Sequence, residues 1–135
     1  MTRVLFVSNG HGEAAIAARI ACELRAILPV ATDHFPLVGD GFASDGFPEV
    51  GPRRRMPSGG LVAMGNVRAF AGDVLAGWPA LFAAQLRFLR DAGPSYAAIV
   101  AVGDAYGCAL ARRSGRPLVF VGTAKSVYVA PYGAF

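Results

Sequence analysis

The clearest pattern along the chain is the alternation of unbroken apolar runs with longer amphipathic stretches. Residues 3–8 and 97–103 are almost continuously apolar, which is typical of strands buried on both faces of a parallel sheet. Runs at 30–35 and 117–122 predict two further strands, and a short strand is expected near 49–51. The apolar runs therefore predict a sheet of about five strands.

The stretches between these runs have the periodicity of helices. Helices are expected over 13–28, 61–91 and 104–114, the second with an interruption at Trp78-Pro79. Strand–helix alternation favours right-handed crossovers, which place parallel strands in one sheet and helices on both of its faces. The sequence thus predicts an α/β chain that forms a single Rossmann-like domain with a doubly wound parallel sheet. The first helix carries one apolar stripe, formed by Ile16, Ile20, Leu24 and Ile27.

The composition is that of one globular domain with more apolar surface than its core requires. The chain has 135 residues, 54% of them hydrophobic. The longest suspicious apolar run, 74–86, contains Trp-Pro and falls short of the roughly 20 residues that a membrane span needs. No secretory signal is expected, because the first residues predict a strand that ends in a glycine loop. We therefore expect a cytoplasmic domain whose surplus apolar surface contacts a further domain, a subunit or a lipid face.

Charge and cysteine content narrow the possible partners. The net charge is +4, but the arginine clusters at 53–55 and 112–116 have no interleaved aromatic residues, so nucleic acid is not expected as a ligand. Cys22 and Cys108 lack the spacing of metal ligands. We expect both to be small buried side chains in a reducing compartment, and no metal site is predicted.

The turn between the first strand and the first helix reads SNGHGE, residues 8–13. Residues 10–15 satisfy the G-x-G-x-x-A spacing of dinucleotide-binding turns, and Asp33 lies at about the distance of a ribose-binding acid. Glu13, however, would bring a carboxylate to a bound pyrophosphate, and an acid in the first turn also complements the helix dipole. A nicotinamide-dependent enzyme is therefore the least favoured interpretation.

Sheet topology points to a different use of this turn. In the strand order 3-2-1-4-5, the first and fourth strands are neighbours, and ligands bind at their carboxyl ends. His11 follows the first strand and Asp104 follows the strand that should lie beside it. A histidine oriented by a carboxylate can act as a general base toward a hydroxyl. Asp104 has the alternative role of an N-cap for the next helix.

Five blocks of residues resemble a known family. In order, they are SNGHGE at 8–13, PLVGDG at 36–41, GPRRRMPSGGLVAMG at 51–65, AVGD at 101–104 and FVGTAKS at 120–126. Together they resemble the lipid-A-disaccharide synthase-related proteins, relatives of the lipid A disaccharide synthases among the glycosyltransferases of the GT-B fold. The resemblance spans nearly the whole chain.

This resemblance implies a two-domain enzyme whose N-terminal domain holds the acceptor and whose C-terminal domain binds a nucleotide-sugar donor. The chain resembles the N-terminal domain alone, so the donor-binding domain is expected outside it, and no other cofactor is implied. Lipid A synthases place a candidate base after the fourth strand, which Asp104 matches. Related sugar transferases use a histidine after the first strand, which His11 matches.

Further residues are candidates for contact with the acceptor. The loop at 40–60 is expected to be the most loop-like part of the chain and to close over a ligand, with its arginines near a phosphate. The alternative for this loop is a solvated basic segment without a ligand. The alternative for Lys125, which follows the last strand, is an ordinary surface lysine. The substrate-binding candidates are Asn9, Gly10, Gly12, Ser58, Gly59, Gly60, Lys125 and Ser126.

Two functions follow as hypotheses. The first is the acceptor domain of a glycosyltransferase that moves a sugar from a nucleotide-sugar donor to a hydroxyl of a glycolipid-like or sugar acceptor, with inversion. Such a protein would be cytoplasmic, and this function is compatible with peripheral contact at the inner face of a membrane. The second is a non-catalytic Rossmann-like binding or interaction domain. Under either hypothesis, the expected partner is a C-terminal donor domain or a second copy of the chain. The isolated chain is expected to transfer no sugar.

Overall fold

The computed structural model describes residues 1–37, 46–52, 67–75, 77–103 and 105–122. The strands and helices follow the predicted alternation closely, and most boundaries lie within two residues of those expected from the apolar pattern. In chain order, the elements are β1 (Thr2–Ser8), α1 (His11–Ile27), β2 (Val30–Pro36), α2 (Val67–Leu75), α3 (Trp78–Ala92), the 3-10 turn η1 (Gly93–Ser95), β3 (Ala98–Gly103), α4 (Ala105–Arg112) and β4 (Leu118–Gly122).

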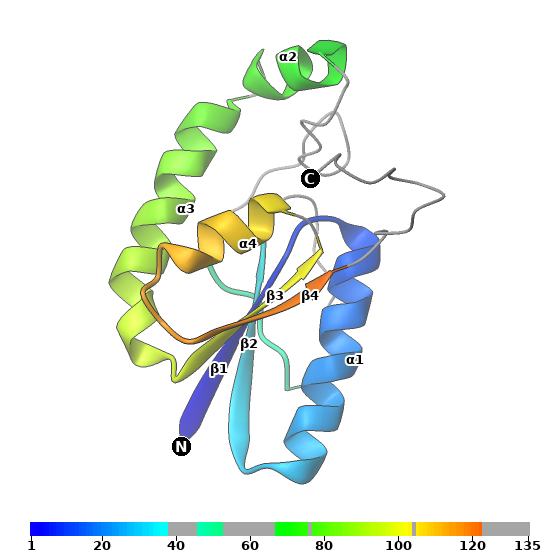
Figure 1. The fold of residues 1–135 in the computed structure, drawn as a ribbon, viewed down its shortest axis with the longest axis vertical. Helices are drawn as coiled ribbons and strands as arrows, with labels where there is room; N and C mark the ends of the chain where they lie inside the picture. Colours follow the sequence, from blue (N-terminus) through cyan, green and yellow to red (C-terminus); the bar gives the residue numbers. More distant parts are fainter. Residues whose placement is uncertain (38–45, 53–66, 76, 104, 123–135) are drawn as a thin grey trace.

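All the strands are parallel, in the order β2-β1-β3-β4 (Figure 1). The register pairs Ser8 with Pro36 on one side and with Val102 on the other, so β1 is central and its carboxyl end lies beside that of β3. The α/β class and the parallel sheet are thereby confirmed. Within the described ranges the sheet has four strands, not about five.

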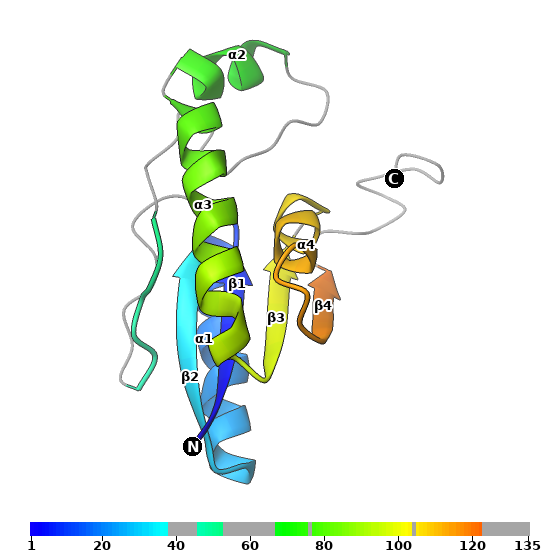
Figure 2. The same cartoon turned by 90° about the vertical axis from the view of Figure 1, so that its left-hand side faces the viewer.

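The expected fifth strand is reduced to a single bridge. Residues 46–52 run beside β2, at the outer edge of the sheet (Figure 2). The amide of His34 donates to the carbonyl oxygen of Pro48 (2.8 Å), and the amide of Val50 donates to the carbonyl of His34 (2.7 Å). Only His34 and Glu49 form a parallel bridge, since the chain turns at Gly51, where φ is +84°. The segment is loop-like, and the rest of the expected loop lies outside the described residues.

Helices cover both faces of the sheet, with α1 on one face and α3 with α4 on the other (Figures 1 and 2). Alternation along the strands divides the core accordingly. Val4 and Phe6 pack toward α1, whereas Leu5 and Val7 pack toward α3 and α4. Each strand therefore contributes apolar side chains to two cores, which explains why its sequence is continuously apolar.

The face of α1 that packs on the sheet is not the predicted isoleucine stripe. The buried positions are small, which lets the helix axis approach the strands closely. Ile16 and Ile27 are instead 40% and 76% exposed, while Ile20 and Leu24 pack at the margin of the core. The side chains that face the sheet are Ala14, Ala17, Ala18 and Ala21.

Two other expectations concern surface and membrane. Cys22 is exposed and Cys108 is partly buried, so the prediction that both are buried is wrong for Cys22. Cys22 lies on the outer surface of α1, one residue after Ala21, which faces the sheet. Among the described residues, no helix combines the length and apolar character needed to cross a bilayer.

Candidate functional site

The candidate site lies at the carboxyl ends of β1 and β3. From β1 the chain crosses to β2 on one side, and it later places β3 on the other, so the strand order reverses at this point. Such a reversal leaves the crevice where ligands bind to open parallel sheets. The two chain segments that leave the edge contain Gly10 and Gly103, with φ of +124° and +131°. These backbone conformations are ones that side-chain-bearing residues rarely adopt.

Glu13 lies between these two glycines. A Cβ atom built on Gly10 would lie 2.6 Å from Oε2 of Glu13, and one on Gly103 would lie 3.0 Å from its Cγ. The side chain thus reaches back over the turn before its own helix and across to the end of β3. Both glycines have a backbone conformation that other residues rarely adopt, and at Gly103 a Cβ atom would also press on the Cγ atom of Glu13. From the sequence, Glu13 is expected to oppose a bound pyrophosphate and to complement the helix dipole, and it is not among the predicted site residues.

The predicted catalytic histidine is at this edge. His11 is the first residue of α1 and is exposed, so its ring is accessible to a ligand. Asn9 is 4% exposed, and Gly10 is the residue that precedes the helix. Gly12 faces open space, because a Cβ atom there would meet nothing within 4 Å. The remaining predicted site residues lie outside the described residues: Ser58, Gly59, Gly60, Asp104, Lys125 and Ser126.

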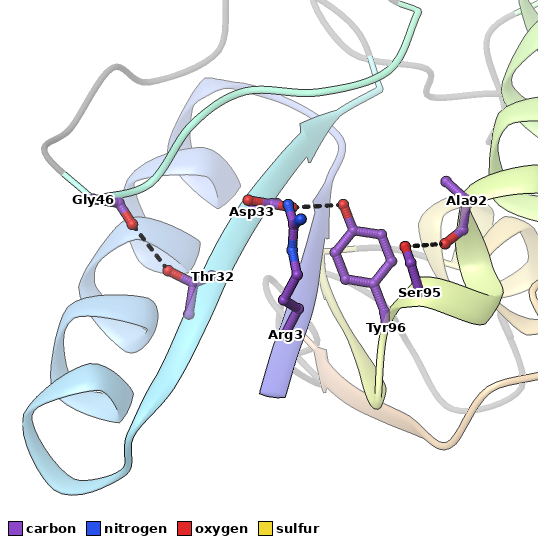
Figure 3. A network of polar contacts seen from close by, with 7 residues as sticks. All are labelled: Arg3, Thr32, Asp33, Gly46, Ala92, Ser95 and Tyr96. Carbon is purple, nitrogen blue, oxygen red and sulfur yellow. Dashed lines mark hydrogen bonds and ion pairs between the residues drawn. The ribbon is translucent and has the colours of Figure 1, made fainter. Parts of the chain in front are cut away.

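Asp33 is engaged in a separate network. It lies in the middle of β2 and is 2% exposed. Its Oδ2 atom pairs with the guanidinium of Arg3 and accepts a hydrogen bond from the hydroxyl of Tyr96 (2.7 Å; Figure 3). The guanidinium also lies 5.6 Å from the centre of the Tyr96 ring. This placement does not support a ribose-binding role, since Asp33 is away from the carboxyl edge and already binds two side chains.

The same network perturbs the acid–base properties of its members. Burial raises the pKa of the Tyr96 hydroxyl, and its hydrogen bond to Asp33 raises it further, because the bond is lost when the phenol ionises. The hydrogen bond and charge of Asp33 raise the pKa of Arg3. The network therefore holds one carboxylate, one guanidinium and one neutral phenol, which is a stabilising arrangement.

Ser8 and His34 form a second buried polar pair that the sequence did not indicate. Both residues are fully buried, and the Ser8 hydroxyl lies 2.7 Å from Nε2 of His34. The imidazole stacks on the ring of Phe47, with centroids 4.7 Å apart and an interplanar angle of 6°. His34 therefore holds residues 46–52 through its backbone and its ring. Complete burial makes this pair a structural contact rather than a group that meets substrate.

Gln85 joins several segments near the same edge of the sheet. This α3 residue is fully buried, and its Nε2 donates to the carbonyl oxygens of Leu37 (2.5 Å) and Pro52 (3.2 Å). Its Oε1 accepts a hydrogen bond from the hydroxyl of Tyr106 in α4 (3.1 Å). One amide thus satisfies two carbonyls and one hydroxyl. The sequence signal was a glutamine within the apolar helical repeat Leu81, Gln85, Leu89.

Metal ligation is not indicated in the part of the chain that the structure describes, where no group of three His, Cys, Asp or Glu side chains is placed to hold an ion.

Compared with known proteins, the chain matches no family model and no curated sequence. The resemblance to the lipid-A-disaccharide synthase-related proteins therefore stays a prediction made from the residues.

Proposed function

We propose that this chain is the acceptor-binding half of a glycosyltransferase. In this proposal, the crevice between β1 and β3 holds a hydroxyl of a sugar or glycolipid-like acceptor, and a separate domain supplies the nucleotide-sugar donor. The observation that carries the proposal is the parallel register that joins β1 to β3, with Ser8 opposite Val102. It brings the turn that contains His11 beside the end of a strand nearly one hundred residues away.

The groups at this edge suit hydroxyl chemistry. His11 is exposed, and Glu13 is half-buried beside Gly10 and Gly103. In the proposed transfer, the acceptor oxygen attacks the anomeric carbon of the donor, and a bond forms between these atoms. The bond from that carbon to the diphosphate breaks on the opposite side, and the nucleoside diphosphate leaves. The acceptor proton passes to His11 or to Asp104, which acts as general base.

The binding half of this proposal can be tested on the chain by itself. Amide resonances would be followed by nuclear magnetic resonance during titration with octyl β-D-glucoside below its micelle concentration, and in parallel with NAD. We expect the glucoside to shift the resonances of residues 9–13 and Gly103, and NAD to leave them in place. Shifts caused by NAD alone would contradict the proposal and favour a dinucleotide site. The isolated chain should transfer no sugar from a nucleotide-sugar donor.

The catalytic half requires an enzyme form that includes the donor-binding domain. There, His11→Ala and Asp104→Asn should each lower the transfer rate by roughly 10²–10⁴, the usual contribution of a general base. If the two act as a unit, the double variant should be little slower than either single variant. Full activity in Asp104→Asn would assign Asp104 to helix capping, because asparagine caps a helix about as well as aspartate.

The alternative, a non-catalytic interaction domain, is favoured by one feature of the surface. Large apolar side chains are exposed on β4 and at the end of α2, with Val119 57% and Leu75 89% exposed. Such side chains are common at protein interfaces. Sedimentation velocity would separate the two proposals. Stable self-association, together with no glucoside-induced shift at residues 9–13, would favour the interaction domain.

A further inference from the structure

The outer side of α1 carries large apolar side chains that the core of the domain leaves exposed. The helix packs on the sheet through four alanines, so its opposite side is turned away from the strands (Figures 1 and 2). Ile16 and Ile27 are 40% and 76% exposed. The eleven residues from one to the other make about three helical turns, so both side chains lie on one line along the helix.

Two opposite charges lie on the same side of α1, between these isoleucines. Arg19 and Glu23 pair with each other (2.7 Å), and 78% and 61% of their side chains are exposed. They follow Ile16 at spacings of three and seven residues, which places them on its side of the helix. The point midway between the two charged residues is Ala21. The point midway between the two isoleucines lies half a residue further along the helix, so the charged pair and the apolar pair share one centre.

We infer that the outer side of α1 is a docking surface for a second copy of the chain, with the two α1 helices antiparallel about a two-fold axis near residue 21. This axis brings Ile16 of each copy against Ile27 of the other. The same axis brings Arg19 of each copy against Glu23 of the other, because both pairs have the same centre. Parallel helices in register would place like charges together instead. The charge pattern of this side therefore complements itself, and a second copy is the occupant that it fits.

The size of the contact sets the expected strength of the dimer. One pair of helices buries less area than the interfaces of stable dimers. We therefore expect a reversible dimer with a dissociation constant on the order of tens of micromolar. The surface is separate from the exposed side chains of β4 and α2, and it does not use the turn that precedes α1. The acceptor proposal can thus fail while the dimer stands, and the reverse also holds.

The apolar contact would be tested by sedimentation equilibrium of the whole chain, from low to high micromolar concentration. Ile27→Gln should raise the dissociation constant of the dimer at least about tenfold, because each copy loses a buried apolar side chain. Leu75→Gln is the matched control, since Leu75 is also an exposed apolar residue at the end of a helix, with 89% of its surface accessible. It should leave the dissociation constant unchanged.

The charged contacts allow a stricter test. Arg19→Glu and Glu23→Arg should each raise the dissociation constant at least about tenfold, because like charges then meet across the axis. Net charge alone predicts the opposite for Arg19→Glu, since the chain carries +4 and this change lowers it. An equal mixture of the two variants should associate about as tightly as the parent, because the two acids of one then face the two arginines of the other. A fluorescent label at the N-terminus of one variant would identify the mixed dimer, whose formation also shows that both variants are folded.

Three results would overturn this inference. The first is a chain that stays monomeric over the whole concentration range. The second is a dimer that the α1 variants leave intact, or that Leu75→Gln or Val119→Gln weakens as much as Ile27→Gln does, because the interface would then lie elsewhere or be non-specific. The third is a mixture of the two charge variants that does not associate although circular dichroism shows each of them folded, since antiparallel pairing requires that they do.

Discussion

Asp33 on strand β2 and Glu13 on helix α1 are two acids with different surroundings. Asp33 is 2% exposed and binds Arg3 and Tyr96, which come from β1 and from the residue after η1. Glu13 is half-buried at the carboxyl edge, close to the glycines of two turns. The first acid is enclosed by side chains from other elements, whereas the second lies at the edge where we propose that a ligand binds.

The difference shows why the type of residue does not by itself indicate a site. Asp33 has the sequence distance expected of a ribose-binding acid, yet its network closes it off in the interior. Glu13 has the position of an ordinary helix-stabilising acid, yet its side chain lies close to Gly103 at the end of β3. We therefore expect the network of Asp33 to contribute more to stability than Glu13 does. Four measurements test this division, in order of decreasing expected effect on stability.

Asp33→Ala should cause the largest loss. Removal of the carboxylate leaves the buried Tyr96 hydroxyl without its acceptor, which costs about 1–3 kcal/mol. The side chain of Arg3 is 49% exposed, so hydration of its guanidinium offsets much of the free energy lost with the ion pair. We expect the free energy of unfolding, measured with urea, to fall by about 2–3 kcal/mol. A loss below about 0.5 kcal/mol, as expected for the exposed Glu23→Ala control, would place Asp33 outside the stabilising network.

Gly103→Ala should destabilise by about 1–3 kcal/mol, because alanine is strained at this backbone conformation and its methyl group would press on Glu13. Adding Glu13→Ala should restore part of the loss, since it removes the contact and leaves only the backbone strain. Gly12→Ala is the control: it lies in α1, meets no atom within 4 Å, and should be neutral or stabilising. Strictly additive losses in the double variant would show that Glu13 does not contact Gly103.

Tyr96→Phe should cost about 1–1.5 kcal/mol near neutral pH, within the range of one net hydrogen bond, because Arg3 still pairs with Asp33 in the variant. Because folding raises the pKa of Tyr96 above its ordinary value of 10.0, its contribution is complete below about pH 10 and is lost as the pH rises further. The stability difference between parent and variant should therefore narrow above pH 10. Urea unfolding at several alkaline pH values measures it, and a gap that widens with pH would contradict this assignment.

Glu13→Gln should change stability least, by less than about 1 kcal/mol, since an acid near a helix N-terminus contributes about 0.3–1 kcal/mol. Thermal unfolding at low and high salt would measure the change, and salt should reduce it. Asp33→Asn provides the comparison, because the same loss of charge should be several times more damaging in the enclosed network. Equal losses at the two positions would show that the enclosure of Asp33 adds nothing to its contribution to stability.

The order of the sheet and the location of the site were predictable because they depend on local patterns and a general rule of connection. Continuous apolar runs indicated β1 and β3, and the strand order of a Rossmann-like doubly wound sheet makes these two strands neighbours. The turn at residues 8–13 then had to lie at the carboxyl edge. Hydrophobic periodicity was less informative for α1, because this helix packs on the sheet through small alanines and not through its larger apolar residues.

Tertiary structure alone decided which polar groups meet. Tyr96 is 63 residues from Asp33, and Gln85 is 48 residues from the Leu37 carbonyl that it binds. Such contacts depend on strand register and on the rotation of each helix against the sheet, which a one-dimensional pattern of apolar positions does not specify. The same holds for Glu13: its place in the first turn of a helix is written in the sequence. Its contact with Gly103 exists only because β1 and β3 end side by side.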